Sequence, residues 1–204
     1  MIDLVHKKFK DYTPYINGHD KMNKFSIFIP LVKNELNETC ILFQVRAKTL
    51  RNQPSEISFP GGRIENNETP ADASIRETCE ELGFCKSNVN LISELDLFVN
   101  YSNMIIHPFV GEIKNLDLIN INKDEVENVF LVPLKYLLET TPNYYTSSVE
   151  VIPSDDFPFE LVPNKHDYKF KTSSYDIVFY KYKEYVIWGI TAKILENFIK
   201  FLKT

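Results

Sequence analysis

Apolar residues in this chain fall into short runs typical of strands, separated by a few longer segments with helical spacing. Such runs predict strands over residues 25–32, 39–46, 89–100, 104–113 and 126–134, and residues 175–189 are typical of a hairpin. The predicted helices cover residues 2–12, 69–82, 135–140 and 190–202. Strands outnumber helices, so we expect an α/β or α+β domain in which helices cover the faces of a mixed sheet.

The helix predicted over residues 69–82 has clear start and stop signals. Thr69 is a cap residue, Pro70 suits the first helical position, and Gly83 suits a left-handed C-terminal cap. At 100° per residue, four side chains fall within an arc of about 60°. We expect this face to pack on the sheet; its members are Ala71, Ile75, Thr78 and Leu82.

Another side of the same helix gathers acid. Glu77, Glu80 and Glu81 fall within an arc of about 100°. The simplest interpretation is a solvated acidic face. Like charges at i, i+4 cost roughly 0.2–0.5 kcal/mol per pair, however, and anions in the last turn oppose the helix dipole. Arg76 offsets only one of these acids, whereas a divalent cation would reverse the sign of every penalty.

A glycine turn precedes this helix. Phe59, Pro60, Gly61 and Gly62 end an extended segment, and the two glycines allow tight geometry with accessible backbone carbonyls. Such a turn is a weak signal by itself. Coupled at fixed spacing to a helix rich in carboxylates, it predicts an oxygen-rich site of the kind that magnesium or manganese prefers.

Composition narrows the function classes. The 204 residues fit one domain over 1–204, and the net charge of −5 argues against general affinity for nucleic acid or anionic membranes. No run of about 18 apolar residues predicts a membrane span. Three cysteines form no pairing framework, which favours a reducing, cytoplasmic setting. Oligomeric state stays open, and residues 141–175 are interpreted as an insertion, a substrate lid or a dimer contact.

The spacing of these residues resembles a known motif. Gly62, Glu68, Arg76–Glu77, Glu80–Glu81 and Gly83 stand as in the Nudix box, G-x5-E-x7-R-E-U-x-E-E-x-G-U, with Thr78 in place of the first aliphatic U. The resemblance implies an α/β/α sandwich with a mixed sheet and a catalytic loop-helix-loop. It also implies that Glu77, Glu80 and Glu81 are catalytic and bind Mg²⁺ or Mn²⁺, with the Gly61 carbonyl as an extra ligand.

The segment before the box is similar to the coenzyme A diphosphatase branch of that family. Arg46, Leu50–Arg51 and residues 59–62 match, whereas Gln53 stands where histidine is usual and Ser55 where glycine is usual. This resemblance implies cleavage of coenzyme A or its derivatives to adenosine 3',5'-bisphosphate and 4'-phosphopantetheine.

Several roles stay open at this point. Arg46 and Arg51 suit phosphate contacts, with surface ion pairs as an equally weighted alternative. The general base is either one of the helix glutamates or a loop acid such as Glu125 or Glu127. For Glu68 a role in orienting Arg76 is placed slightly ahead of metal binding. The alternative functions are hydrolysis of another nucleoside diphosphate derivative (ADP-ribose, NADH or a nucleoside triphosphate) and nucleotide sensing without catalysis.

Overall fold

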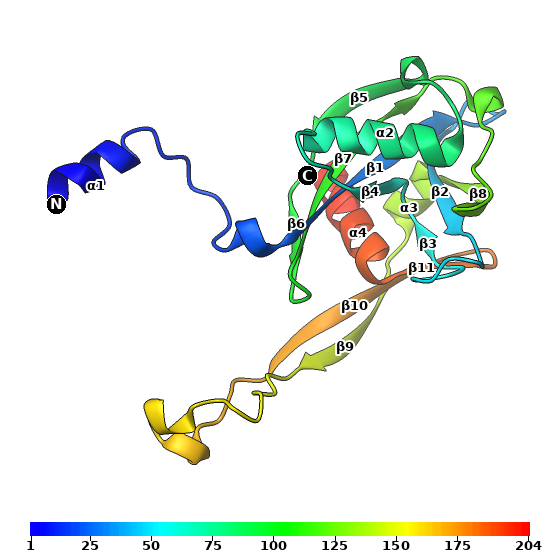
Figure 1. Ribbon diagram of the computed structural model, residues 1–204. Helices are drawn as coiled ribbons and strands as arrows, with labels where there is room; N and C mark the ends of the chain where they lie inside the picture. Colours follow the sequence, from blue (N-terminus) through cyan, green and yellow to red (C-terminus); the bar gives the residue numbers. More distant parts are fainter.

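A mixed sheet of eight strands forms the middle layer of the computed structural model, which describes residues 1–204 (Figure 1). Its strands are β1 (Asn23–Lys33), β2 (Thr39–Arg46), β3 (Ile57–Ser58), β4 (Gly61–Arg63), β5 (Val89–Glu94), β6 (Phe98–Asn100), β7 (Met104–Ile113) and β8 (Val126–Pro133). The helices are α1 (Ile2–Phe9), α2 (Pro70–Leu82), α3 (Leu134–Glu139) and α4 (Gly189–Lys203). A second sheet holds β9 (Asn143–Val149), β10 (Ser173–Tyr182) and β11 (Tyr185–Trp188).

The long strand β1 organises the sheet. It pairs in parallel with β7 along one edge. On the other edge its first half pairs antiparallel with β4 and its last residues pair antiparallel with β2. Strand β2 continues to β3 and β8, so the short strands around the glycine turn are inserted into the centre of the sheet. The turn therefore lies where α2 crosses the sheet.

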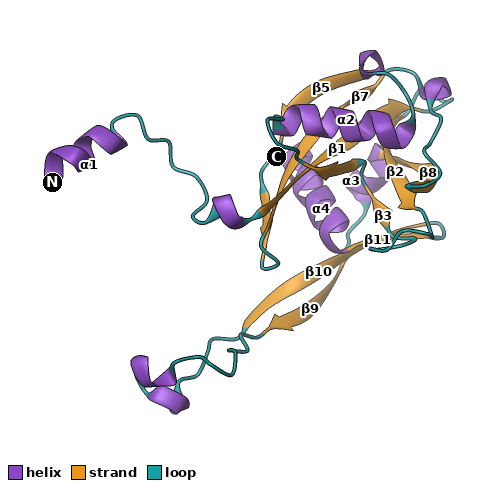
Figure 2. Ribbon diagram, in the orientation of Figure 1, coloured by secondary structure: helices purple, strands orange, loops and turns teal.

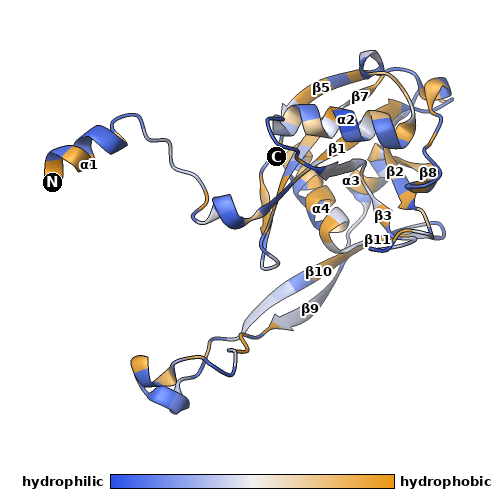
Figure 3. Ribbon diagram, viewed as in Figure 1, coloured by the Kyte–Doolittle hydropathy of each residue, from blue (hydrophilic) through white to orange (hydrophobic).

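Helices cover both faces of this sheet, with α2 on one side and α4 on the other (Figure 2). Successive strand residues point to opposite faces, and both faces are buried. Phe28 and Leu42 pack with Leu82 of α2, whereas Ile29 and Phe43 belong to the core on the α4 side. Because both faces are covered, the central strands are apolar almost without a break (Figure 3). The predicted α/β/α arrangement is confirmed.

Most predicted elements are confirmed with small changes at their ends. The strand predicted over 89–100 is broken into β5 and β6, and the N-terminal helix ends at Phe9, short of the predicted residue 12. Leu202, near the end of α4, is 43% exposed. Trp188, at the junction of β11 with α4, is 41% exposed and stacks on Phe179.

Two segments extend away from the three layers (Figure 1). One is α1, none of whose residues is buried. The other is an arm in which β9 pairs with β10, so residues 141–175 form an antiparallel ribbon with two short 3₁₀ turns near its tip. Nothing in the sequence of this segment indicated that its ends pair. No helix of the chain has both the length and the apolar character needed to cross a bilayer.

Candidate active site

Helix α2 presents the acidic residues, and its ends are fixed as the sequence predicts. The Thr69 side chain accepts a hydrogen bond from the Asp72 backbone N–H at 3.1 Å. Gly83 has a φ of 71°, the left-handed conformation that glycine adopts readily, and its N–H donates to the Cys79 carbonyl. These two caps fix the bounds of the helix at Pro70 and Leu82.

The buried face of α2 differs from the predicted one. Thr78 and Leu82 are buried as expected, but Ala71 and Ile75 are only half-buried. The other buried positions are Ala73, Ser74 and Glu81. The simplest interpretation, a solvated acidic face, does not hold for Glu81, which is 3% exposed and points toward the sheet. Angular spacing alone missed this because hydrogen-bond partners on the sheet make the burial of this carboxylate tolerable.

Two donors from different strands, Gln44 of β2 and Gly61 of β4, hold the Glu81 carboxylate. The Gly61 backbone N–H donates to Oε2 at 2.9 Å, and the Gln44 side chain donates through Nε2 to Oε1 at 3.0 Å. Burial raises the pKa of Glu81 to about 7, although both hydrogen bonds favour the ionised form. Both of these partners are neutral, and no cationic side chain forms an ion pair with this buried carboxylate.

Arg76 joins the remaining acids of the box. Its guanidinium donates to both oxygens of Glu68, at 2.8 and 3.0 Å, and its Nη1 donates to Glu77 at 2.8 Å and Glu80 at 3.0 Å. The predicted role of Glu68 in orienting Arg76 is confirmed. The hydrogen bonds to Arg76 lower the pKa of Glu68. Burial raises the pKa of Glu77 despite the same guanidinium.

Gly62 lies directly under the Glu77 carboxyl group. A Cβ atom at this position would overlap the three atoms of that group. Gly61 lies against β1 instead, where a Cβ atom would meet the Ser26 carbonyl and lie 2.7 Å from Ile27 Cα. The two glycines thus let the turn fit between β1 and the acids of α2. The structure places the Gly61 N–H at the Glu81 carboxylate.

The two predicted phosphate-binding arginines occupy different surroundings. Arg46 lies at a bulge between β2 and β8, and bulges often redirect side chains near active sites. Its Nη2 donates to the Asn52 carbonyl at 3.3 Å, and its Nε is buried with no hydrogen-bond partner. Arg51 is exposed on the following loop. In that loop Ser55 has a φ of 61°, a conformation that glycine adopts without strain.

The two candidate loop acids are also distinguished. The Asn122 backbone N–H donates to the Glu81 carbonyl at 2.9 Å, and the Glu125 N–H donates to the Asn122 carbonyl at 3.0 Å, so the loop that carries Glu125 lies against the end of α2. The charge of Glu125 contributes to raising the pKa of Glu77 and of Glu81. Glu127 instead pairs with Lys48 at 3.3 Å in an exposed ion pair.

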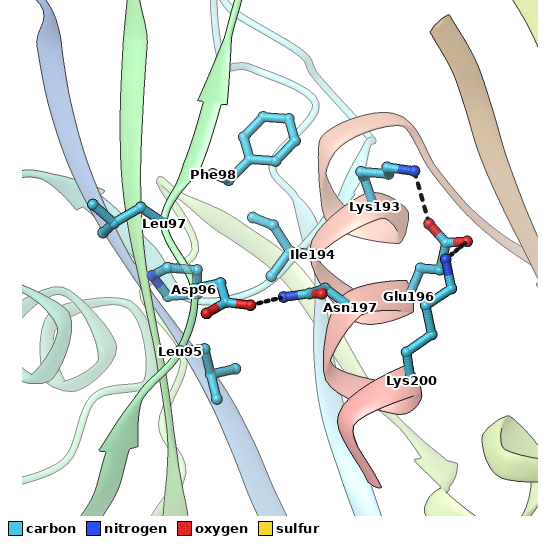
Figure 4. A pocket seen from close by; sticks show the side chains of 10 residues that line it. Leu95, Asp96, Leu97, Phe98, Lys193, Ile194, Glu196, Asn197 and Lys200 are labelled. Carbon is cyan, nitrogen blue, oxygen red and sulfur yellow. Dashed lines mark hydrogen bonds and ion pairs between the residues drawn. The ribbon is translucent and has the colours of Figure 1, made fainter. Parts of the chain in front are cut away.

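Two hollows of the protein lie away from the residues of the box. One, of about 310 Å³, lies between α4 and the strand segments around residues 95–98 (Figure 4). Within it Glu196 pairs with Lys193 and Lys200, and Asn197 donates to Asp96. A second hollow, of about 790 Å³, involves Tyr15, His107 and the end of α4. Neither is lined by residues of α2, β3 or β4, so these two hollows are separate from the candidate site.

The donor set of the box fits a hard divalent cation. Carboxylate oxygens of Glu77, Glu80 and Glu81 come from little more than one helical turn, and magnesium and manganese prefer such ligands. The side chains do not form a closed ligand cluster, since Arg76 lies between Glu77 and Glu80 and Glu81 points inward. The buried Glu81 carboxylate, with only neutral direct partners, is the donor that would gain most from a cation.

Comparison with known proteins identifies this arrangement. A NUDIX domain matches residues 22–154. The chain belongs to the Nudix family. Glu68, Arg76 and the acids of α2 are therefore the Nudix box of this protein, held by the contacts described above.

Curated relatives of this Nudix protein include two named as coenzyme A diphosphatases. It is 30% identical over 178 residues to peroxisomal coenzyme A diphosphatase NUDT7 of Mus musculus, covering 87% of this chain and 69% of the mouse protein. It is 33% identical over 104 residues to peroxisomal coenzyme A diphosphatase ndx-8 of Caenorhabditis elegans, covering 50% of this chain and 44% of the worm protein. The family and these relatives identify the chain as a Nudix hydrolase of the diphosphatase class.

A solved structure supports the fold. The MutT/nudix family protein from Enterococcus faecalis matches with a TM-score of 0.52 at 14% identity, covering 100% of this chain and 70% of that one. At this identity the likeness concerns the fold alone.

Proposed function

We propose that this Nudix hydrolase cleaves the diphosphate of coenzyme A or its derivatives, giving adenosine 3',5'-bisphosphate and 4'-phosphopantetheine, with Mg²⁺ or Mn²⁺. The observation that carries the proposal is a complete acidic helix in a chain that aligns over 87% of its length with a protein named as a coenzyme A diphosphatase. Residues 1–204 act in this proposal as one Nudix domain, with 141–175 as an inserted arm.

The residues of the box divide the work. Glu77, Glu80 and Glu81 would hold the cation, with the Gly61 carbonyl as a further ligand. When bound, such an ion polarises the phosphoryl oxygens and makes a water molecule more acidic. Arg76, fixed by Glu68, keeps the Glu77 and Glu80 side chains in place on the helix surface.

The chain also offers groups for the substrate and for proton transfer. Arg46 carries a buried N–H without a partner, and Arg51 is exposed on the adjoining loop, so both guanidinium groups are available to phosphate oxygens. We assign proton abstraction to Glu125, because Glu77, Glu80 and Glu81 would hold the cation and Glu127 is engaged by Lys48. The assignment places a base on the loop that faces the acidic helix.

The substrate is tested by offering coenzyme A, ADP-ribose, NADH and nucleoside triphosphates to the purified protein, with and without metal. We expect metal-dependent release of 4'-phosphopantetheine from coenzyme A. Cleavage of ADP-ribose or nucleotides with coenzyme A left intact would establish the second candidate function, which the departures at Gln53 and Ser55 favour. Absence of turnover on every compound would leave a nucleotide sensor.

Metal binding is tested on the same protein without substrate. An ion present at 100 times its dissociation constant stabilises a fold by about 2.7 kcal/mol, or roughly 5–10 °C in Tm for a chain of this size. We expect Glu81→Gln to remove most of this rise and to abolish turnover. An unchanged rise in the Glu81→Gln protein would contradict the assignment of this residue as a ligand.

The location of the protein is a separate question. We keep the cytoplasm as the proposed location on the basis of the odd number of cysteines. Both relatives named as coenzyme A diphosphatases are also named as peroxisomal. Microscopy of the full chain carrying a fluorescent tag at either end distinguishes the two compartments.

A further inference from the structure

Gln44 is an amide in the middle of an otherwise apolar strand. It stands between Phe43 and Val45 in β2, and its side chain is fully buried, with 0% of its surface exposed. The preceding residues on its face of the strand, Cys40 and Leu42, belong to the core that packs against α2. A polar side chain at such a position lowers stability unless its hydrogen bonds are made.

Those hydrogen bonds are made on one side only. Gln44 Nε2 donates to Glu81 Oε1 at 3.0 Å and lies 3.3 Å from Ser58 Oγ, whereas its Oε1 is buried without a partner. A carboxylate only accepts hydrogen bonds, so the amide must turn its nitrogen toward Glu81 and leave its oxygen unpaired. A buried polar atom without a partner costs about 1–3 kcal/mol. Leucine or methionine would avoid that cost but would leave Oε1 of the buried Glu81 carboxylate without its donor, so the amide is explained by Glu81 and not by the packing of β2.

The contact has a geometric consequence for the acid. Gly61 N–H fixes Oε2 and Gln44 fixes Oε1, so the two oxygens are held by donors from separate segments of the sheet. With one donor removed, the carboxylate would be free to rotate about the bond to the other. Groups that orient metal-binding carboxylates in this way typically affect metal affinity or activity by 10–100-fold.

We propose that Gln44 is a positioning residue, which orients the Glu81 carboxylate for divalent metal and so sets the metal affinity of the site. This inference rests on the proposed role of Glu81 as a metal ligand, and it does not depend on which diphosphate is the substrate. Gln44 makes no contact with substrate in this proposal and acts only through Glu81.

The test compares Gln44→Met with Ser58→Ala. Methionine keeps the length and volume of the side chain and removes both the donor and the unpaired oxygen. Ser58→Ala removes the other partner of the amide and leaves the contact with Glu81. The measurements are Mn²⁺ affinity of the protein alone by isothermal titration calorimetry, Tm without metal, and kcat and KM on whichever diphosphate the unmodified protein hydrolyses.

For Gln44→Met we expect Mn²⁺ affinity to fall 10–100-fold and kcat at a fixed, subsaturating metal concentration to fall with it, while KM stays within about twofold. Its Tm without metal should stay within a few degrees of that of the unmodified protein, since removing the unpaired oxygen offsets the loss of the donor to Glu81. Ser58→Ala should stay within about twofold on affinity and kcat.

Three results would overturn the proposal. The first is unchanged Mn²⁺ affinity in Gln44→Met. The second is an equal loss of Mn²⁺ affinity in Ser58→Ala, which would assign the amide to the pairing of β2 with β3. The third is the absence of Mn²⁺ binding by the unmodified protein. If Gln44→Met does not fold, Gln44→Asn retains an amide that is one methylene too short to reach Glu81 and must show the same loss. Failure of coenzyme A as a substrate would leave the affinity measurement intact, so the two proposals fail separately.

Discussion

Replacing Gly62 by alanine should disable the site and spare the fold. The new methyl group would overlap the Glu77 carboxyl group, the far end of a flexible side chain that can move. Displacing it from its preferred rotamer costs about 0.5–1.5 kcal/mol. Gly62 is not in the left-handed region, so alanine also restricts the unfolded chain and regains about 0.4–1 kcal/mol. The net change in the free energy of unfolding should therefore be within about 1 kcal/mol.

Gly61→Ala is the matched control, because its methyl group would clash with rigid backbone and should lower the stability of the fold. Its φ of 152° is one that other residues rarely adopt, and its Cβ would meet the backbone of Ser26 and Ile27, which cannot move aside. Backbone strain of about 1–3 kcal/mol and overpacking of about 1–3 kcal/mol give a loss of roughly 2–6 kcal/mol. At 2–4 °C per kcal/mol this lowers Tm by roughly 5–20 °C.

Thermal unfolding by circular dichroism, Mn²⁺ titration and turnover distinguish the two variants. Gly62→Ala should keep its Tm within a few degrees and lose 10–100-fold in metal affinity or kcat. The reasoning is refuted if Gly62→Ala retains full metal affinity and turnover, which would show that the position of Glu77 is unimportant. It is also refuted if both variants lose similar stability, since the neighbour of Gly62 would then be as rigid as that of Gly61.

Two further predictions concern acids outside the box helix. Burial raises the pKa of Glu196, but hydrogen bonds from Lys200, Lys193 and Tyr144 bring it down to about 2. The ionised form therefore stabilises the fold above about pH 4.5, and this contribution is lost as the pH falls toward 2. With 1.36 kcal/mol per pKa unit, this contribution to the free energy of unfolding amounts to about 3 kcal/mol. Glu196→Gln should remove that part of the pH dependence of urea unfolding between pH 2 and 5. An unchanged pH profile would show that these hydrogen bonds are already made in the unfolded chain. Glu125→Gln should lower kcat by 10²–10⁴ as expected for loss of a general base, whereas Glu127→Gln, which breaks only an exposed ion pair, should change it less than threefold; equal effects would reject Glu125 as the base.

Local signals in the sequence determined much of this protein. Apolar runs located the strands because both faces of the sheet are covered, and Thr69 and Gly83 fixed the ends of the acidic helix because caps act within one turn. The i, i+4 spacing paired Arg76 with Glu80, and the spacing of the box indicated the family. Each of these features depends on residues close together in the chain.

Contacts between distant segments were decided only by the tertiary structure. Helical spacing places Glu81 beside Glu77 and Glu80, but hydrogen bonds from the Gly61 N–H and the Gln44 amide turn it into the protein, where burial raises its pKa. The polar break at Gln44 in an apolar strand was visible in the sequence, yet its partner lies 37 residues away. The pairing of β9 with β10 has the same origin. Hydrogen bonds between remote segments follow from the packing of the sheet, and no local pattern specifies them.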